Sequence, residues 1–91
     1  MQYYVVTFTH TKIVGWVIYL HAHVKYLKEL LAEKKLRASG LYANNLFAGL
    51  SILSVQSRAE AEEIMKNDPY VKEIGATYKV IEWDPKFGDF K

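Results

Sequence analysis

The order of its local sequence patterns is the feature that most constrains what this chain can fold into. Segments rich in β-branched and aromatic residues favour strands, and segments with apolar residues at helical spacing favour helices. They follow one another as strand, helix, strand, strand, helix, strand, with strands predicted at 3–9, 36–42, 48–56 and 76–83 and helices at about 20–36 and 57–67. This is the order of the ferredoxin-like βαββαβ unit, an antiparallel sheet with both helices on one face. The sequence therefore predicts an α+β fold.

The first predicted helix is marked by an apolar stripe, formed by Leu20, Val24, Leu27 and Leu31. The segment 10–19 before it mixes apolar and polar residues without a clear period, and we expect a loop there.

The second predicted helix is marked by its ends. Ser57 and Glu60 have the spacing of a capping box, in which the Ser57 hydroxyl accepts from the Glu60 N–H and the Glu60 carboxylate accepts from the Ser57 N–H. Pro69 disfavours helical geometry at Asp68 and ends the helix, and 70–74 is expected to form one further turn.

Size and composition indicate one small domain, spanning residues 1–91, with 85–91 as a C-terminal tail. The absence of cysteine suits a reducing compartment, and we expect a cytoplasmic protein. The net charge is only +2 and the lysines are scattered, which argues against nucleic-acid binding. The apolar run 13–20 is too short to span a membrane.

Both faces of the predicted sheet are apolar, which bears on the oligomeric state. In the first strand, Tyr3 and Val5 alternate with Tyr4, Val6 and Phe8, and the third and fourth strands repeat this pattern. The helices cover one face only. Because monomers rarely expose a contiguous apolar patch, we expect a homo-oligomer, most simply a dimer through the helix-free sheet face.

The histidines are the first candidates for proton transfer, because their ordinary pKa lies near neutral pH. At 100° per residue, His23 lies at the flank of the buried stripe of its helix, whereas His21 points to solvent. Two histidines on one helix can share a metal ion when they are four residues apart, and His21 and His23 are not. No cysteine is available either, so no metal site is predicted. His10 is a candidate for the mouth of a pocket, although a solvated loop histidine is the preferred interpretation.

An ordered set of motifs resembles the YCII-related (YciI-like) family. His23 is followed at three and four positions by Tyr26 and Leu27, the pair Ser39-Gly40 follows in the next strand, and Asp68-Pro69-Tyr70 comes after the second helix. The resemblance implies a dimeric α+β barrel-type assembly with a pocket in each subunit, a small-molecule ligand and an acid-base pair. Carried onto this chain, the pair is His23 and Asp68, and no cofactor is expected. The expected substrate-binding residues are Ser39, Gly40, His10, Trp16 and Tyr70.

Two positions depart from the family pattern. A Gly-Pro pair in the second strand is Gly40-Leu41 here, and an arginine that often precedes the helix histidine is absent. An anionic group of a substrate would lack that arginine. The 10–19 segment, with Lys12 and Trp16, is the candidate to line the pocket instead.

Two classes of function stay open on the sequence alone. One is a small enzyme in which His23, held by the Asp68 carboxylate, moves a proton in an elimination, isomerisation or hydrolysis, with Ser39 as a donor to developing negative charge. The other is a non-catalytic homodimeric module that binds a small ligand. RNA binding is a distant third, because segment 48–52 lacks the stacking aromatic residues of RNA-recognition domains.

Overall fold

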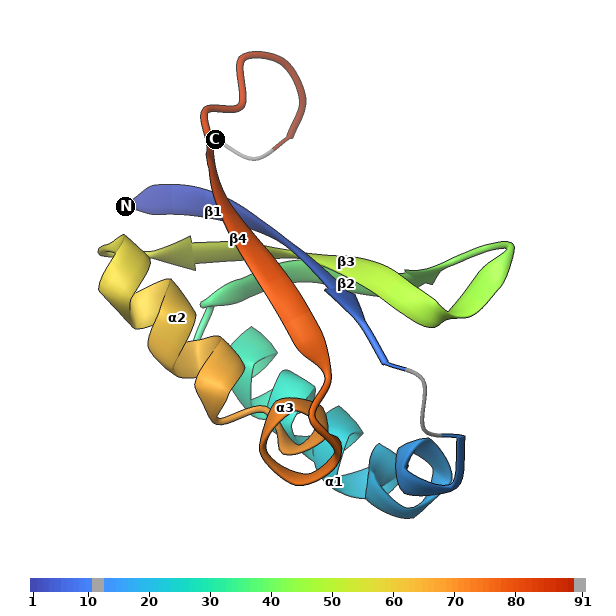
Figure 1. The fold of residues 1–91 in the computed structure, drawn as a ribbon. Coiled ribbons are helices and arrows are strands. Elements are labelled where there is room, and N and C mark those ends of the chain that lie inside the picture. The colour runs from blue at the N-terminus through green and yellow to red at the C-terminus, as the bar shows by residue number, and fades with distance from the viewer. Residues whose placement is uncertain (11–12, 90–91) are drawn as a thin grey trace.

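One side of a four-stranded sheet carries the helices, and the other side carries none among the residues that the structure describes (Figure 1). The structure is a computed structural model that describes residues 1–10 and 13–89. Its elements are β1 (Gln2–Thr9), α1 (Ile13–Ala32), β2 (Leu36–Tyr42), β3 (Asn45–Val55), α2 (Arg58–Lys66), α3 (Pro69–Ile74) and β4 (Thr77–Trp83). None of these helices is long and apolar enough to cross a membrane.

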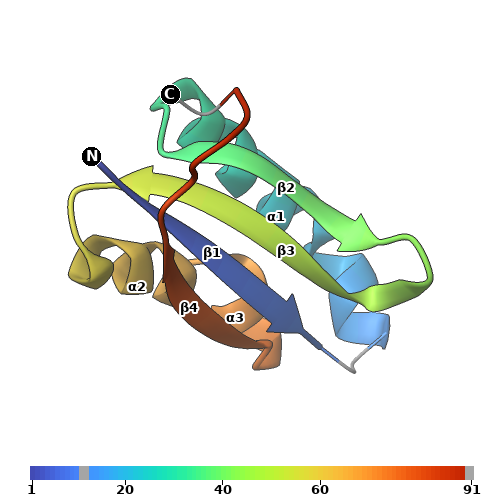
Figure 2. The same cartoon turned by 90° about the horizontal axis from the view of Figure 1, so that it is seen from above.

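The strands lie in the order β2-β3-β1-β4, and each neighbouring pair is antiparallel (Figure 2). Strand β1 is therefore central, paired with β3 on one side and with β4 on the other. This is the arrangement of the ferredoxin-like unit, so the predicted α+β fold is confirmed.

The two faces of the sheet alternate as the sequence predicts. The main core lies under the helices, and Val6, Leu53 and Val55 are almost fully excluded from solvent there. On the other face, the cross-strand partners form an apolar row across all four strands: Ala38, Ile52, Val5 and Ile81. Ile81 keeps 43% of its surface exposed at the end of this row. The helix-free face is therefore apolar at its centre.

Helix α1 begins at Ile13, so the prediction of a loop over 10–19 is wrong for 13–19. The local sequence disfavours a helix there, because Gly15 and β-branched residues such as Val17 and Ile18 have low helix propensity. Tertiary contacts override this preference, since Trp16 and Tyr19 pack on the buried cluster of α3. Lys12 lies outside the described residues.

The buried side of α1 also differs from the prediction. Leu20, Val24 and Leu31 keep between 38% and 49% of their surface exposed, whereas Leu30 is buried. The half-buried residues before Leu30 on the same side are Tyr19, His23 and Tyr26. Three of the four residues of the expected apolar stripe are therefore rotated away from the core, and only Leu27 packs against it.

Both ends of α2 and the start of α3 follow from side-chain caps. Ser57 Oγ accepts from the Glu60 N–H at 3.2 Å, as predicted. The second half of the predicted capping box is wrong, because the Glu60 carboxylate accepts from the Gln56 N–H at 2.8 Å rather than from the Ser57 N–H. The further turn expected after Pro69 is present as α3.

Gly49 of β3 lies close to the backbone of β2 and to the ring of Phe8. A Cβ atom at this position would collide with the Gly40 carbonyl oxygen and lie 2.7 Å from Phe8 Cζ. We expect Gly49→Ala to lower the free energy of unfolding by about 1–3 kcal/mol, the cost of overpacking. Gly40→Ala is the matched control, because a Cβ at Gly40 meets nothing within 4 Å. Equal urea midpoints for the two variants would contradict this reading.

Candidate active site

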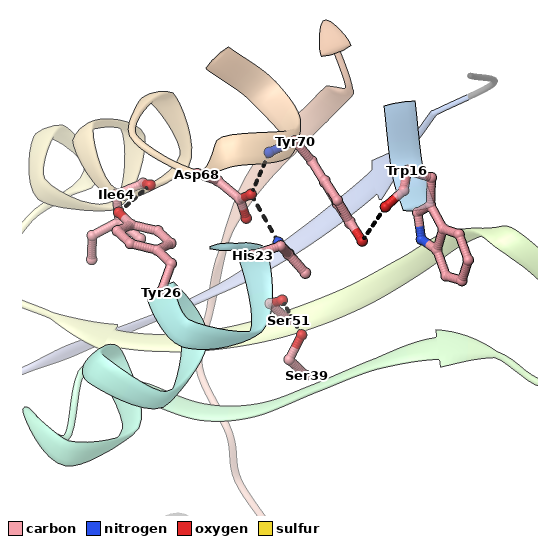
Figure 3. A network of polar contacts seen from close by, with 8 residues as sticks. All are labelled: Trp16, His23, Tyr26, Ser39, Ser51, Ile64, Asp68 and Tyr70. Carbon is pink, nitrogen blue, oxygen red and sulfur yellow. Dashed lines mark hydrogen bonds and ion pairs between the residues drawn. The ribbon is translucent and has the colours of Figure 1, made fainter. Parts of the chain in front are cut away.

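The imidazole of His23 and the carboxylate of Asp68 meet, although the two residues are 45 positions apart in the sequence (Figure 3). The distance between His23 Nδ1 and Asp68 Oδ1 is 2.9 Å. His23 lies on α1, and Asp68 is the residue that caps α3. The pair is largely shielded from solvent, since 13% of the His23 side chain and 7% of the Asp68 side chain are exposed.

The Asp68 carboxylate is held in place by the backbone around it. Pro69 restricts Asp68 to extended geometry, and its φ and ψ are −64° and 129°. From this geometry, Asp68 Oδ1 also accepts the Tyr70 N–H at 2.9 Å. The oxygen that contacts His23 is therefore fixed by the start of α3 as well as by the histidine.

The Asp68 contact determines which tautomer of neutral His23 is present. A carboxylate only accepts hydrogen bonds, so His23 Nδ1 must carry the proton and donate it. The lone pair of the neutral ring then lies on Nε2, the nitrogen away from Asp68. This is the protonation state that a general base requires.

Tyr70 supports the histidine from one side. Its ring stacks on the His23 ring with centroids 3.9 Å apart and an angle of 10° between the planes. Burial, and secondarily the charge of Asp68, raises the pKa of Tyr70 to about 12. The neutral hydroxyl donates to the Trp16 carbonyl oxygen at 3.4 Å, which ties α3 to the start of α1.

Beside His23 lies a cavity of about 190 Å³ between α1 and the strands. The described residues around it are mostly apolar, and they are Phe8, Trp16, Leu20, His23, Val24, Leu27, Ser39, Gly40, Leu41 and Tyr70. Leu20 and Val24 are two of the three α1 stripe residues that are exposed rather than buried in the core, and Leu31 is the third. Leu20, Val24 and Leu27 form an apolar wall of the pocket. None of the described lining residues carries a fixed charge.

Four of the five expected substrate-binding residues line this cavity, namely Ser39, Gly40, Trp16 and Tyr70. His10, the fifth, does not line it. The roles of all these residues stay predictions, as do those of His23 and Asp68. No group of three or more potential metal ligands occurs among residues 1–10 and 13–89.

His10 lies behind the pocket rather than at its mouth. It is 4% exposed and is surrounded by the rings of Trp16, Phe47 and Tyr70. Neither ring nitrogen has a hydrogen-bond partner in the described part of the chain. The solvated loop histidine is therefore wrong as well. Burial, and secondarily the charge of His23, lowers the pKa of His10 below its ordinary value of 6.5.

This burial of His10 predicts a loss of stability in acid. As the pH falls below 6.5, the unfolded chain binds a proton at His10 that the folded chain rejects, so the free energy of unfolding decreases. The loss develops between 6.5 and the lowered pKa of the folded state. We expect His10→Phe to weaken this acid sensitivity, measured as the shift in urea midpoint between pH values of about 7.5 and about 5. His21→Phe, at an exposed position, is the control, and an unchanged shift in His10→Phe would refute the assignment.

One polar residue near the pocket, Ser51, was not predicted from the sequence. Ser51 is 5% exposed on β3, in a segment that reads as apolar, and its Oγ lies 2.8 Å from Ser39 Oγ. The signal that could have found it is a serine at a position where the strand alternation requires a core residue.

The comparisons with known proteins agree with this fold. The family model of the YCII-related domain matches residues 19–84, well over half of the chain. A search of curated proteins gave no match. Among solved structures, the chain is similar to 5-chloro-2-hydroxyhydroquinone dehydrochlorinase (TftG) from Burkholderia phenoliruptrix AC1100, in complex with 2,5-dihydroxybenzoquinone. The TM-score is 0.74 and the identity 21%, over 90% of this chain and 93% of that one. With the family model matching most of its length, the chain belongs to the YCII-related domain family.

Proposed function

We propose that this protein is a small-molecule enzyme in which His23 and Asp68 act as an acid-base pair, most simply in an elimination. The observation that carries the proposal is the 2.9 Å contact between His23 Nδ1 and Asp68 Oδ1 beside an apolar cavity. A solvent-shielded histidine with a fixed carboxylate partner is the arrangement that general base catalysis uses. The structurally similar dehydrochlorinase supports elimination as the reaction class.

In the proposed reaction, His23 Nε2 removes a proton from a carbon or hydroxyl group of the substrate. The electron pair left behind forms a new double bond, and the leaving group departs with its own bonding pair. The Asp68 carboxylate stabilises the imidazolium that forms. His23 then releases the proton to water or to the leaving group. General acid-base catalysis of this kind contributes about 10²- to 10⁴-fold in rate.

The cavity limits the substrate to a small, mainly apolar molecule. Its volume of about 190 Å³ lies below the roughly 300–1,000 Å³ of pockets that hold drug-sized ligands. The walls contributed by Phe8, Trp16 and Leu27 suit the faces of a planar ring. We therefore expect a single-ring substrate, with hydroxyl or carbonyl groups directed toward His23 and Ser39.

A direct test is to incubate the protein with 5-chloro-2-hydroxyhydroquinone and other halogenated, hydroxylated single-ring compounds. Halide release is measured by ion chromatography, and exchange of ring protons with deuterium by NMR. We expect at least one compound to lose halide or exchange protons faster than in buffer. Ligands that bind in the pocket without either reaction would refute the enzyme and favour the non-catalytic binding module.

We also propose that the protein is a homodimer, formed through the helix-free face of the sheet. The support is the apolar row Ala38, Ile52, Val5 and Ile81, which crosses all four strands and has no helix above it in the described part of the chain. Burial of such a row against a second copy removes apolar surface from water, which stabilises the dimer by roughly 25 cal/mol for each Å² buried. In a dimer with two-fold symmetry, the row of one subunit packs against the same row of the other, so no apolar row is left for a third subunit.

A further inference from the structure

The pair Ser39 and Ser51 has a hydrogen-bond direction that can be worked out from burial. Each hydroxyl has one proton, and the two oxygens are 2.8 Å apart, so only one of the two protons lies between them. Ser51 is 5% exposed and shares its face of the sheet with Val6 and Leu53. Within the described residues, the Ser39 hydroxyl is its hydrogen-bond partner.

A donor left unpaired in such surroundings is costly, whereas an unpaired donor at the open edge of a pocket can bond to water or ligand. The favoured arrangement therefore has Ser51 donating to Ser39 Oγ. The Ser39 proton is then not used within the pair.

Ser39 is exposed on β2 and lines the same cavity as His23, and its hydroxyl belongs to a strand across the cavity from α1 (Figure 3). Its proton can therefore point into the cavity. A hydroxyl that accepts one hydrogen bond is also a better donor of the next, because chains of hydrogen bonds polarise one another. Ser51 thus both orients and strengthens the donor.

We propose that Ser51 is a positioning residue, which turns the Ser39 hydroxyl toward an oxygen atom of a bound phenolate or cyclic enolate. This rests on the proposed function, in which His23 removes a proton and negative charge develops on the substrate. No lysine or arginine is among the described residues that line the pocket to receive that charge. A neutral donor opposite the base fills this role without binding carboxylates or phosphates strongly.

The test uses 4-nitrophenol, a single-ring phenol whose phenolate is yellow, titrated with the protein over a range of pH. We expect the wild-type protein to bind the phenolate in preference to the phenol, which lowers the apparent pKa of the bound probe. Ser39→Ala should weaken phenolate binding by about 10- to 100-fold, and Ser51→Ala by about 3- to 10-fold, while binding of the neutral phenol changes little.

Ser54→Ala is the matched control, because Ser54 is equally buried on the same strand but faces the opposite side of the sheet. A purely structural role of Ser51 would lower the melting temperature and weaken both forms of the probe alike. That result would overturn the proposal, as would wild-type protein that fails to bind 4-nitrophenolate.

The outcome is separable from the proposed enzyme activity. His23→Gln should reduce turnover by about 10²- to 10⁴-fold and retain the dependence of phenolate binding on Ser39. Turnover that depends on His23, together with identical phenolate affinities in wild type, Ser39→Ala and Ser51→Ala, would overturn only the assignment of the serines. Serine-dependent phenolate binding without turnover of any compound would overturn only the enzyme.

Discussion

His23→Gln should reduce turnover of any substrate of this protein by about 10²- to 10⁴-fold, the usual contribution of a general base. Glutamine keeps a polar side chain of similar reach that can still donate to Asp68, but it has no basic nitrogen. The loss should therefore appear in kcat rather than in KM, measured as halide release or proton exchange at saturating substrate.

His21→Gln is the matched control, because His21 lies two residues away on α1 and is exposed. It should leave both kinetic constants unchanged. Equal turnover by wild type and His23→Gln would remove His23 from the mechanism and leave the pocket as a binding site.

Two substitutions of Asp68 separate its effect on kcat from its effect on the stability of the fold. Asparagine at position 68 can still accept the Tyr70 N–H, so Asp68→Asn should keep the start of α3 and most of the stability. It should nevertheless lose kcat by a factor of about 10²–10⁴, because an amide carries no charge to stabilise the imidazolium. Asp68→Ala removes the cap as well and should cost about 0.5–2 kcal/mol in the free energy of unfolding.

Ile81→Lys should convert the proposed dimer into monomers. Ile81 lies at the β4 end of the apolar row, next to Val5 of β1, and is 43% exposed in the single chain. A lysine there is solvated in the monomer, whereas in a sheet-to-sheet dimer its ammonium group would be buried against a second apolar row, at a cost of several kcal/mol. Sedimentation equilibrium over a dilution series should show the change in mass.

Ile18→Lys is the control for this experiment. Ile18 is 66% exposed on α1, away from the sheet, so its replacement should leave the dimer intact. The reverse pattern, with dissociation caused by Ile18→Lys alone, would place the interface on α1. A wild-type protein that stays folded and monomeric at all concentrations would remove the sheet-face dimer altogether.

The elements that carry the candidate site were largely predictable from the sequence, because short-range patterns mark the ends of helices and strands. Pro69 and Asp68 define the turn before α3 through steric restriction and a side-chain cap, both of which are local effects. His23 was identified by its place on the helix surface, and its half-buried environment agrees with that reading. The distance between the two side chains was not predictable from these patterns, since it depends on how α1 packs against α3.

The errors fall where long-range contacts override local preference. Helix α1 extends back to Ile13 although Gly15 weakens a helix, because Trp16 and Tyr19 gain contacts with α3. The expectation of a solvated His10 was wrong because the rings of Trp16, Phe47 and Tyr70 enclose it. Ser51 was overlooked because its importance depends on Ser39, and the register of β2 and β3 that pairs these two residues is not visible in the sequence.

The sequence by itself determined the order of the elements and the alternation of the two sheet faces, since both follow from side-chain periodicity along a local backbone. It also marked His23 and Asp68 as candidates. Only the tertiary structure decided that their side chains meet at 2.9 Å, that most of the α1 stripe lines a pocket, and that His10 is buried. The physical reason is that the burial and the partners of a residue depend on segments that are far apart in the sequence and that are brought together by the packing of the helices on the sheet.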